Sequence, residues 1–136
     1  HMMKLCKDAS ETWSDVDFWC VTLEINIANA ASLHFRHDDS VDVRAVSTLV
    51  GDGIVLASND AIDWKQYDED VNEVGNNPKL SEDQVKAWNA KIASVVQKAC
   101  KGDIVLMRGG NSTALRPCVY RSPYPNDDDM AHLVIT

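Results

Sequence analysis

Several features that would assign this sequence to a specialised class are absent. No run of about 18 apolar residues occurs, so no membrane-spanning helix is expected, and no apolar run of signal-peptide length follows the start. These absences favour a soluble cytoplasmic protein, and no metal site or other cofactor is predicted. The cysteines are too widely spaced for a CxxC zinc or redox motif, and all four are expected to be free thiols: Cys6, Cys20, Cys100 and Cys118.

Positive charge is also scarce. The 136 residues include 13 lysines and arginines against 21 aspartates and glutamates, which gives a net charge of −8. Nucleic acids and anionic membranes require a basic surface, so neither is an expected partner, whereas a basic protein is. The length fits one domain. We place it at residues 3–136, because His1 and Met2 resemble the remnant of a purification tag.

Two segments resemble ligand-binding loops but lack the residues that define them. Residues 109–112 (GGNS) follow a strand-like run, but they include no lysine of the phosphate-loop type and precede another strand-like run. In the acidic stretch that begins at Asp68, Glu73 stands where a calcium loop needs glycine, and Lys79 stands where it needs glutamate. We therefore expect a hairpin turn and a carboxylate-rich surface at these two places.

The sequence does contain one clear helix, expected over about residues 81–100. Ser81 followed by Gln84 predicts a capping box, and Gly102 ends the pattern. Apolar residues recur at three- and four-residue spacing and predict one buried stripe: Val85, Trp88, Ile92, Val95, Val96 and Ala99.

Other segments alternate in polarity or are rich in β-branched residues, which predicts strands. These segments are residues 19–27, 43–50, 54–57, 103–108, 113–121 and 130–136. Residues 43–50 and 54–57 are joined by a glycine-containing turn, which favours a hairpin over a short helix. The expected fold class is α+β, with an antiparallel or mixed sheet of about five to seven strands packed by one main helix.

Residues 59–79 are expected to form a long surface loop with at most one helical turn, because polar residues predominate there. Aromatic rings framed by carboxylates are typical of the centre and rim of a protein interface. The alternative is that the rings fold back onto the core and the carboxylates are merely solvated. The residues of this predicted docking surface are Trp64, Tyr67, Asp68, Glu69, Asp70 and Glu73.

This profile is similar in kind to inhibitor, antitoxin or immunity proteins that cover a basic partner such as a nuclease. In this hypothesis the carboxylates attract the partner, while Trp64 and Tyr67 anchor it. No catalytic residue is predicted.

The alternative hypothesis is a small-ligand-binding protein or a small enzyme, with a pocket lined by cysteine and histidine or by arginines. Cys20 and His34 would then be nucleophile and base. A metal site shared by His34 and His37 is disfavoured, because a three-residue spacing on a strand directs the two rings to opposite faces. A homodimer formed through an exposed strand edge is a third alternative. The pocket residues of the alternative hypothesis are Cys20, His34, Arg108, Arg116 and Arg121.

Overall fold

The computed structural model describes residues 23–27, 33–77, 79–111, 115–124 and 131–135. The first half contains strands β1 (Leu23–Ile27), β2 (Val43–Val50) and β3 (Val55–Ala57), the short 3-10 helix η2 (Asn59–Ala61) and helix α2 (Trp64–Asn76). The second half contains helix α3 (Glu82–Ile92) and strands β4 (Val96–Lys98), β5 (Ile104–Arg108), β6 (Tyr120–Arg121) and β7 (Ala131–Ile135).

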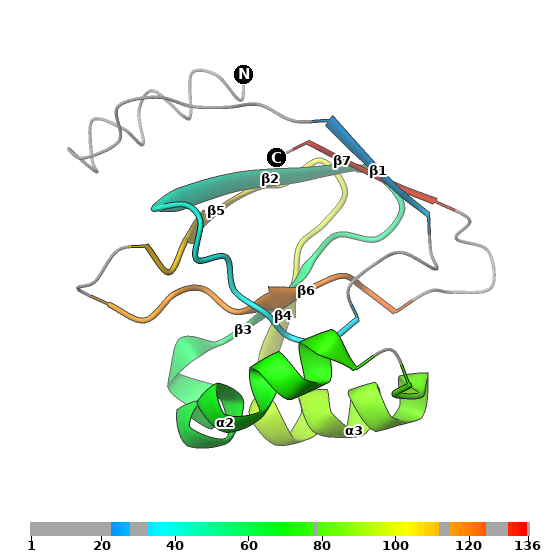
Figure 1. Ribbon diagram of the computed structural model, residues 1–136. Coiled ribbons are helices and arrows are strands. Elements are labelled where there is room, and N and C mark those ends of the chain that lie inside the picture. Colours follow the sequence, from blue (N-terminus) through cyan, green and yellow to red (C-terminus); the bar gives the residue numbers. More distant parts are fainter. Residues whose placement is uncertain (1–22, 28–32, 78, 112–114, 125–130, 136) are drawn as a thin grey trace.

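The strands form two separate antiparallel sheets. One has the order β1-β7-β2-β5 and the other the order β4-β3-β6. Figure 1 shows the four-stranded sheet at one end of the molecule, the helices at the other end and the three-stranded sheet between them. The α+β class is confirmed. Among the described residues the strands form one sheet of four and one of three, where a single sheet of about five to seven was expected, and two α-helices are present where one main helix was expected.

The predicted hairpin between residues 43–50 and 54–57 is also wrong, although both strands exist. β2 pairs with β5 and β7, whereas β3 pairs with β4 and β6, so the chain crosses between sheets at this point. Gly51 has a φ of 81° and permits the turn. A Cβ at Gly53 would lie 2.1 Å from the backbone oxygen of Ala99, so this crossing requires glycine.

Helix α3 begins as predicted and ends earlier than predicted. Ser81 and Gln84 form both halves of the capping box. The helix stops at Ile92, because the following residues turn into β4 and pair with β3. Val95 and Val96 therefore lie exposed and outside the helical stripe, whereas Trp88 and Ile92 are buried as expected.

Helix α2 replaces the predicted long loop over residues 64–76. The Asp63 carboxylate caps it by accepting a hydrogen bond from the Gln66 backbone N–H at 3.1 Å. Tyr67, Val71 and Val74 are spaced for one helical face; Tyr67 belongs to the main core, and the two partly buried valines pack against that core. The many carboxylates are distributed around the rest of the helix.

Two hydrophobic cores connect the layers. The larger core packs the helices against the three-stranded sheet and includes Phe35, Tyr67, Trp88, Ile92 and Val119. The smaller core lies between the two sheets and consists of Val46, Ile54, Met107 and Tyr120. The helices and the four-stranded sheet are thus held on opposite sides of the three-stranded sheet.

The remaining strand predictions have mixed outcomes. Residues 103–108 and 130–136 contain β5 and β7, and residues 19–27 contain β1. The strand predicted at 113–121 is reduced to β6, of two residues, and residues 19–22 and 112–114 lie outside the described part of the chain. Cys100 and Cys118 are free thiols, whereas Cys6 and Cys20 lie outside the described residues. Among the described residues, no helix is long and apolar enough to cross a membrane.

Candidate functional site

An ion pair between α2 and the segment before β6 joins two open grooves. Arg116 Nη1 lies 2.9 Å from Asp68 Oδ2 and 3.1 Å from its Oδ1. Arg116 lines one groove and Asp68 lines the other. Both side chains are about half exposed, so the pair adds little stability by itself. Its structural importance is that it connects the two grooves.

The first groove, called the arginine groove, has a volume of about 540 Å³. Its wall is largely apolar and contains the indole of Trp64, at the start of α2. The indole N–H donates to the Asn59 carbonyl at 3.2 Å, and the Arg116 guanidinium carbon lies 4.7 Å from the ring centroid. The residues lining the groove are Asn59, Asp60, Trp64, Leu106, Arg108, Leu115, Arg116 and Cys118.

Arg108 is the distinctive cation of the arginine groove. It ends β5, and Leu106 lies two residues earlier on the same face of that strand. Within the part of the chain that the structure describes, its guanidinium makes no ion pair and no side-chain hydrogen bond. A positive charge beside an apolar wall attracts an anionic group, because few water molecules compete for it there.

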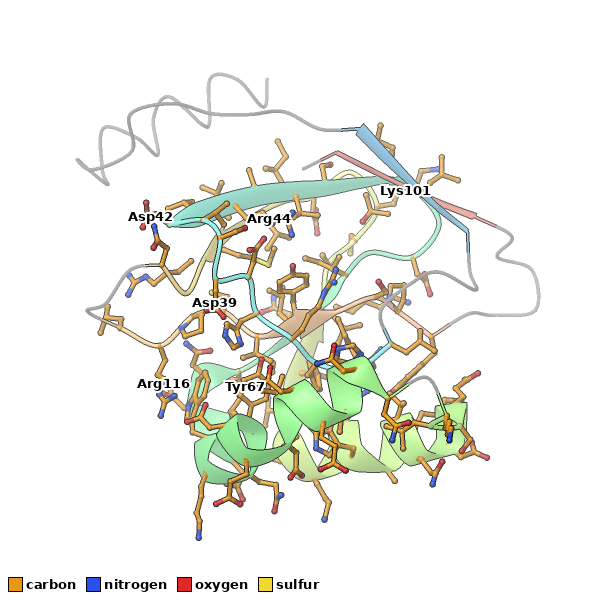
Figure 2. The ribbon with its side chains drawn as sticks, viewed as in Figure 1. Asp39, Asp42, Arg44, Tyr67, Lys101 and Arg116 are labelled. Atoms are coloured by element: carbon orange, nitrogen blue, oxygen red, sulfur yellow. The ribbon has the colours of Figure 1, made fainter. Side chains whose placement is uncertain are left out.

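The second groove, called the histidine groove, lies between the segment before β2 and helix α2. It has a volume of about 450 Å³ and a mostly polar lining. Figure 2 shows Asp39 above Tyr67, where the strand side of the groove faces the helix. The residues lining it are His34, Arg36, His37, Asp39, Asp68, Val71, Asn72, Gly75 and Asn76.

A chain of three side chains forms the inner edge of the histidine groove. The Tyr67 hydroxyl lies 2.6 Å from His37 Nδ1, and His37 Nε2 lies 3.0 Å from Asp39 Oδ1. Burial, with the charges of Asp39 and Asp68, raises the pKa of Tyr67, so its phenol keeps its proton at neutral pH. In the tautomer with the proton on Nε2, Tyr67 donates to the imidazole and the imidazole donates to Asp39.

The Asp39 carboxylate rests against the Gly109–Gly110 turn. A Cβ on Gly110 would lie 1.9 Å from Asp39 Oδ1, so a larger residue would displace the carboxylate. The Gly110 N–H donates to the Asp38 carbonyl at 2.7 Å, and the Gly109 N–H donates to the Asp42 carbonyl at 2.8 Å. The turn that was predicted as a hairpin turn therefore positions the acidic segment.

Asp38 anchors the segment to β2. Its Oδ2 lies 3.1 Å from Arg44 Nη1, and its Oδ1 accepts from the Ser40 N–H at 2.9 Å. Burial acts to raise the pKa of Asp38. The Ser40 hydrogen bonds and the charges of Arg44 and Arg36 outweigh it, so the pKa lies below its usual value.

His34 also lines the histidine groove. Its half-buried imidazole has a pKa below the usual 6.5, first because of burial and second because of the nearby Arg36 charge. A Cβ at Gly75 of α2 would lie 3.2 Å from His34 Nε2, so glycine at this helical position leaves room for the ring.

The residues of the predicted docking surface have separate environments. Tyr67 is 0% exposed and belongs to the core, which agrees with the alternative in which the rings fold back onto the core. Asp70 Oδ2 accepts hydrogen bonds from Gln66 Nε2 at 2.6 Å and from the Trp88 indole at 3.1 Å. Its carboxylate is therefore hydrogen-bonded to side chains of α2 and α3. Trp64 is half-buried and Asp68 is paired with Arg116. Glu69 and Glu73 are exposed.

The predicted pocket residues are also divided. Arg108 and Arg116 meet in the arginine groove, and His34 lines the histidine groove. Arg121 is buried elsewhere, with its guanidinium carbon 3.9 Å from the Tyr124 ring centroid and its Nη1 donating to the Ser122 carbonyl at 2.8 Å. Cys20 lies outside the described residues, so its predicted pairing with His34 is not placed.

Sequence reasoning missed the joint position of His34 and His37. The three-residue spacing was expected to separate the rings, but both line the same groove. The reason is that this segment is not a regular strand and makes only an isolated bridge between Arg36 and Tyr120. The RHDD run at residues 36–39 was the available signal. Within the described ranges, no three histidine, cysteine or carboxylate side chains are grouped so that they could hold a metal ion.

Comparison with family models gives one match, described as a protein of unknown function (DUF1826), over residues 15–136. The chain belongs to this family. Comparison with curated proteins and with solved structures finds no match. The DUF1826 match includes every residue that lines the two grooves, so both grooves belong to the family's domain.

Proposed function

We propose that this DUF1826 domain is a binding protein whose arginine groove takes a small ligand with one anionic group and an apolar, planar body. The observation that carries the proposal is the position of Arg108. Its guanidinium lines a groove with an indole and two leucines, and it has no partner among the described residues.

Each part of the groove matches one part of such a ligand. A carboxylate or sulfonate can form two parallel hydrogen bonds with the Arg108 guanidinium. A planar apolar body can pack on Trp64 and cover Leu115, which is 61% exposed. Covering this leucine removes apolar area from water and adds to the affinity.

The surrounding charge limits how anionic the ligand can be. Asp60 lines the same groove, and the whole chain carries a net charge of −8. In the arginine groove a ligand with several negative charges would be repelled by Asp60, whereas a single anionic group can be compensated by Arg108. The proposal therefore concerns monoanionic, partly apolar molecules.

Fluorescent probes provide a direct test. Anilinonaphthalene sulfonate combines a sulfonate with planar rings, and phenylnaphthylamine is its uncharged counterpart. We expect Arg108→Gln to weaken sulfonate binding about tenfold, which corresponds to about 1.4 kcal/mol, while leaving binding of the uncharged probe unchanged. Lys91→Gln, which removes an exposed charge from α3, is the matched control. Equal sulfonate affinity in the two variants would contradict the proposal.

A second candidate function is the inhibitor-like capture of a basic protein, favoured by the exposure of Asp68, Glu69 and Glu73 on α2. It no longer includes Tyr67 or Asp70 as contacts. We expect the double variant Glu69→Gln and Glu73→Gln to lose a basic partner captured from the source lysate at low salt, since exposed charges act through a screened field. Capture that is unaffected by either the substitutions or added salt would exclude this role.

A further inference from the structure

We propose that the histidine groove is a second and separate ligand site, which takes a small oxyanion between the Arg36 guanidinium and the His34 imidazole. The proposal does not depend on the arginine groove, because the two sites use different side chains. The shared ligand chemistry is a phosphate, sulfate or carboxylate group.

The negative charges of this groove already have cationic or hydrogen-bonding partners. Asp39 is bonded to His37 Nε2 at 3.0 Å, and Asp68 is paired with Arg116 at 2.9 Å. Each of these two carboxylates thus has a nitrogen of another side chain within 3.0 Å. Their repulsion of an incoming anion is reduced accordingly.

The positive charge of Arg36 is not compensated in the same way. Its guanidinium carbon lies 5.5 Å from the Tyr120 ring centroid, and it forms no ion pair within 4.0 Å among the described residues. The side chain is exposed on the groove side. A guanidinium is planar and always charged, so the N–H groups of this exposed side chain can donate hydrogen bonds to an oxyanion.

Helix α2 supplies the opposite wall with polar side chains and space. Asn72 and Asn76 line the groove, and Asn76 Nδ2 donates to the Asn72 carbonyl at 2.8 Å. Gly75 lies between them on the chain. A Cβ there would lie 3.2 Å from His34 Nε2, so the glycine leaves room for the imidazole at this wall.

His34 makes oxyanion binding dependent on pH. Burial and the Arg36 charge disfavour its imidazolium form, and a bound anion would offset both effects by adding a negative charge beside the ring. The other titratable groups at this groove are His37, Asp39 and Asp68, with Tyr67 behind His37. Binding of an oxyanion should therefore be accompanied by proton uptake at His34.

The test uses inorganic sulfate, whose charge is constant across the histidine range. Sulfate affinity and the His34 imidazole signals are followed by NMR at about pH 6 and about pH 8, on either side of the usual histidine pKa. We expect tighter binding at the lower pH and an increase of the His34 pKa when sulfate is bound. Methyl phosphate and acetate, titrated in the same way, distinguish a phosphate source from a carboxylate source.

Three variants make the result specific. Arg36→Gln should weaken sulfate binding at both pH values, and His34→Gln should remove the pH dependence while Arg36 still binds weakly. Arg108→Gln should leave sulfate binding unchanged, which separates this result from the test of the arginine groove. Sulfate binding that is absent at both pH values, or equal in Arg36→Gln and Lys91→Gln, would overturn the proposal. Tight binding of Zn²⁺ lost in His34→Gln and His37→Gln would also overturn it, in favour of a metal site.

Discussion

At the scale of single residues, Tyr67 shows how one side chain serves two purposes. Its ring is fully buried between α2 and the rest of the core, and its hydroxyl reaches His37 at the edge of the histidine groove. Packing of the ring fixes the hydroxyl, and the hydroxyl in turn fixes the imidazole. The residue therefore connects the stability of the core with the geometry of the groove.

We expect Tyr67→Phe to lower the free energy of unfolding by about 1 kcal/mol, because it removes one hydrogen bond and leaves His37 Nδ1 without its donor. Urea denaturation measures this change. A double-mutant cycle with His37→Gln should give a coupling energy of about 1 kcal/mol between the two residues. Strictly additive effects would mean that the hydrogen bond contributes nothing.

His34 gives a prediction for the dependence of stability on pH. Its pKa in the folded protein lies below the value of 6.5 expected for an unfolded chain, so the unfolded state binds the proton more readily. The contribution of this group to stability is therefore complete above 6.5 and is lost as the pH falls through that value toward the folded pKa. Denaturation series of the wild type and His34→Gln should differ in slope only in this range, and parallel slopes would contradict the shift.

At the scale of elements, the start of α3 was readable from local chemistry and its end was not. The capping box joins two residues only three positions apart, so it can be recognised from the local sequence. The end at Ile92 depends on β3, because residues 96–98 pair with that distant strand instead of continuing the helix. Long-range pairing thus overrode a helical pattern that residues 95–99 satisfied on their own.

The capping box of α3 can be tested by Ser81→Ala. This change removes the side-chain acceptor for the Gln84 N–H, so we expect the free energy of unfolding to fall by about 1 kcal/mol. Ser94→Ala, at an exposed position just after the helix, is the matched control. Circular dichroism during urea titration measures both. A loss no greater than that of the control would show that the cap is not used.

Helix α2 was missed for a different physical reason. Seven of its 13 residues carry a carboxylate or amide side chain, which resembles a solvated loop. Only four residues are aromatic or aliphatic, namely Trp64, Tyr67, Val71 and Val74, and they are too few to dominate the pattern. The helix is stabilised by packing against α3 and by the Asp70 contacts with Gln66 and Trp88. Trp88 belongs to another helix, so its contact with Asp70 forms only when the chain folds, and local composition underestimates the helix.

At the scale of the whole molecule, both grooves are lined by residues that are distant in the sequence. The arginine groove collects residues from η2, α2, β5 and the segment before β6, which lie up to 59 positions apart in the sequence. Sequence reasoning proposed Trp64 for docking and Arg108 with Arg116 for a separate pocket. The structure places all three in one groove, and only the tertiary arrangement provides that information.

The central claim is that Arg108 and Trp64 hold the two parts of one ligand. The most direct measurement is an NMR titration with naphthoate, which follows the Arg108 guanidinium N–H and the Trp64 indole N–H. We predict that both signals shift together and saturate with a single Kd, while the Arg44 guanidinium, already bonded to Asp38 and Tyr120, does not respond. If naphthoate shifts neither signal, or shifts Arg44 as much as Arg108, the arginine groove is not the binding site.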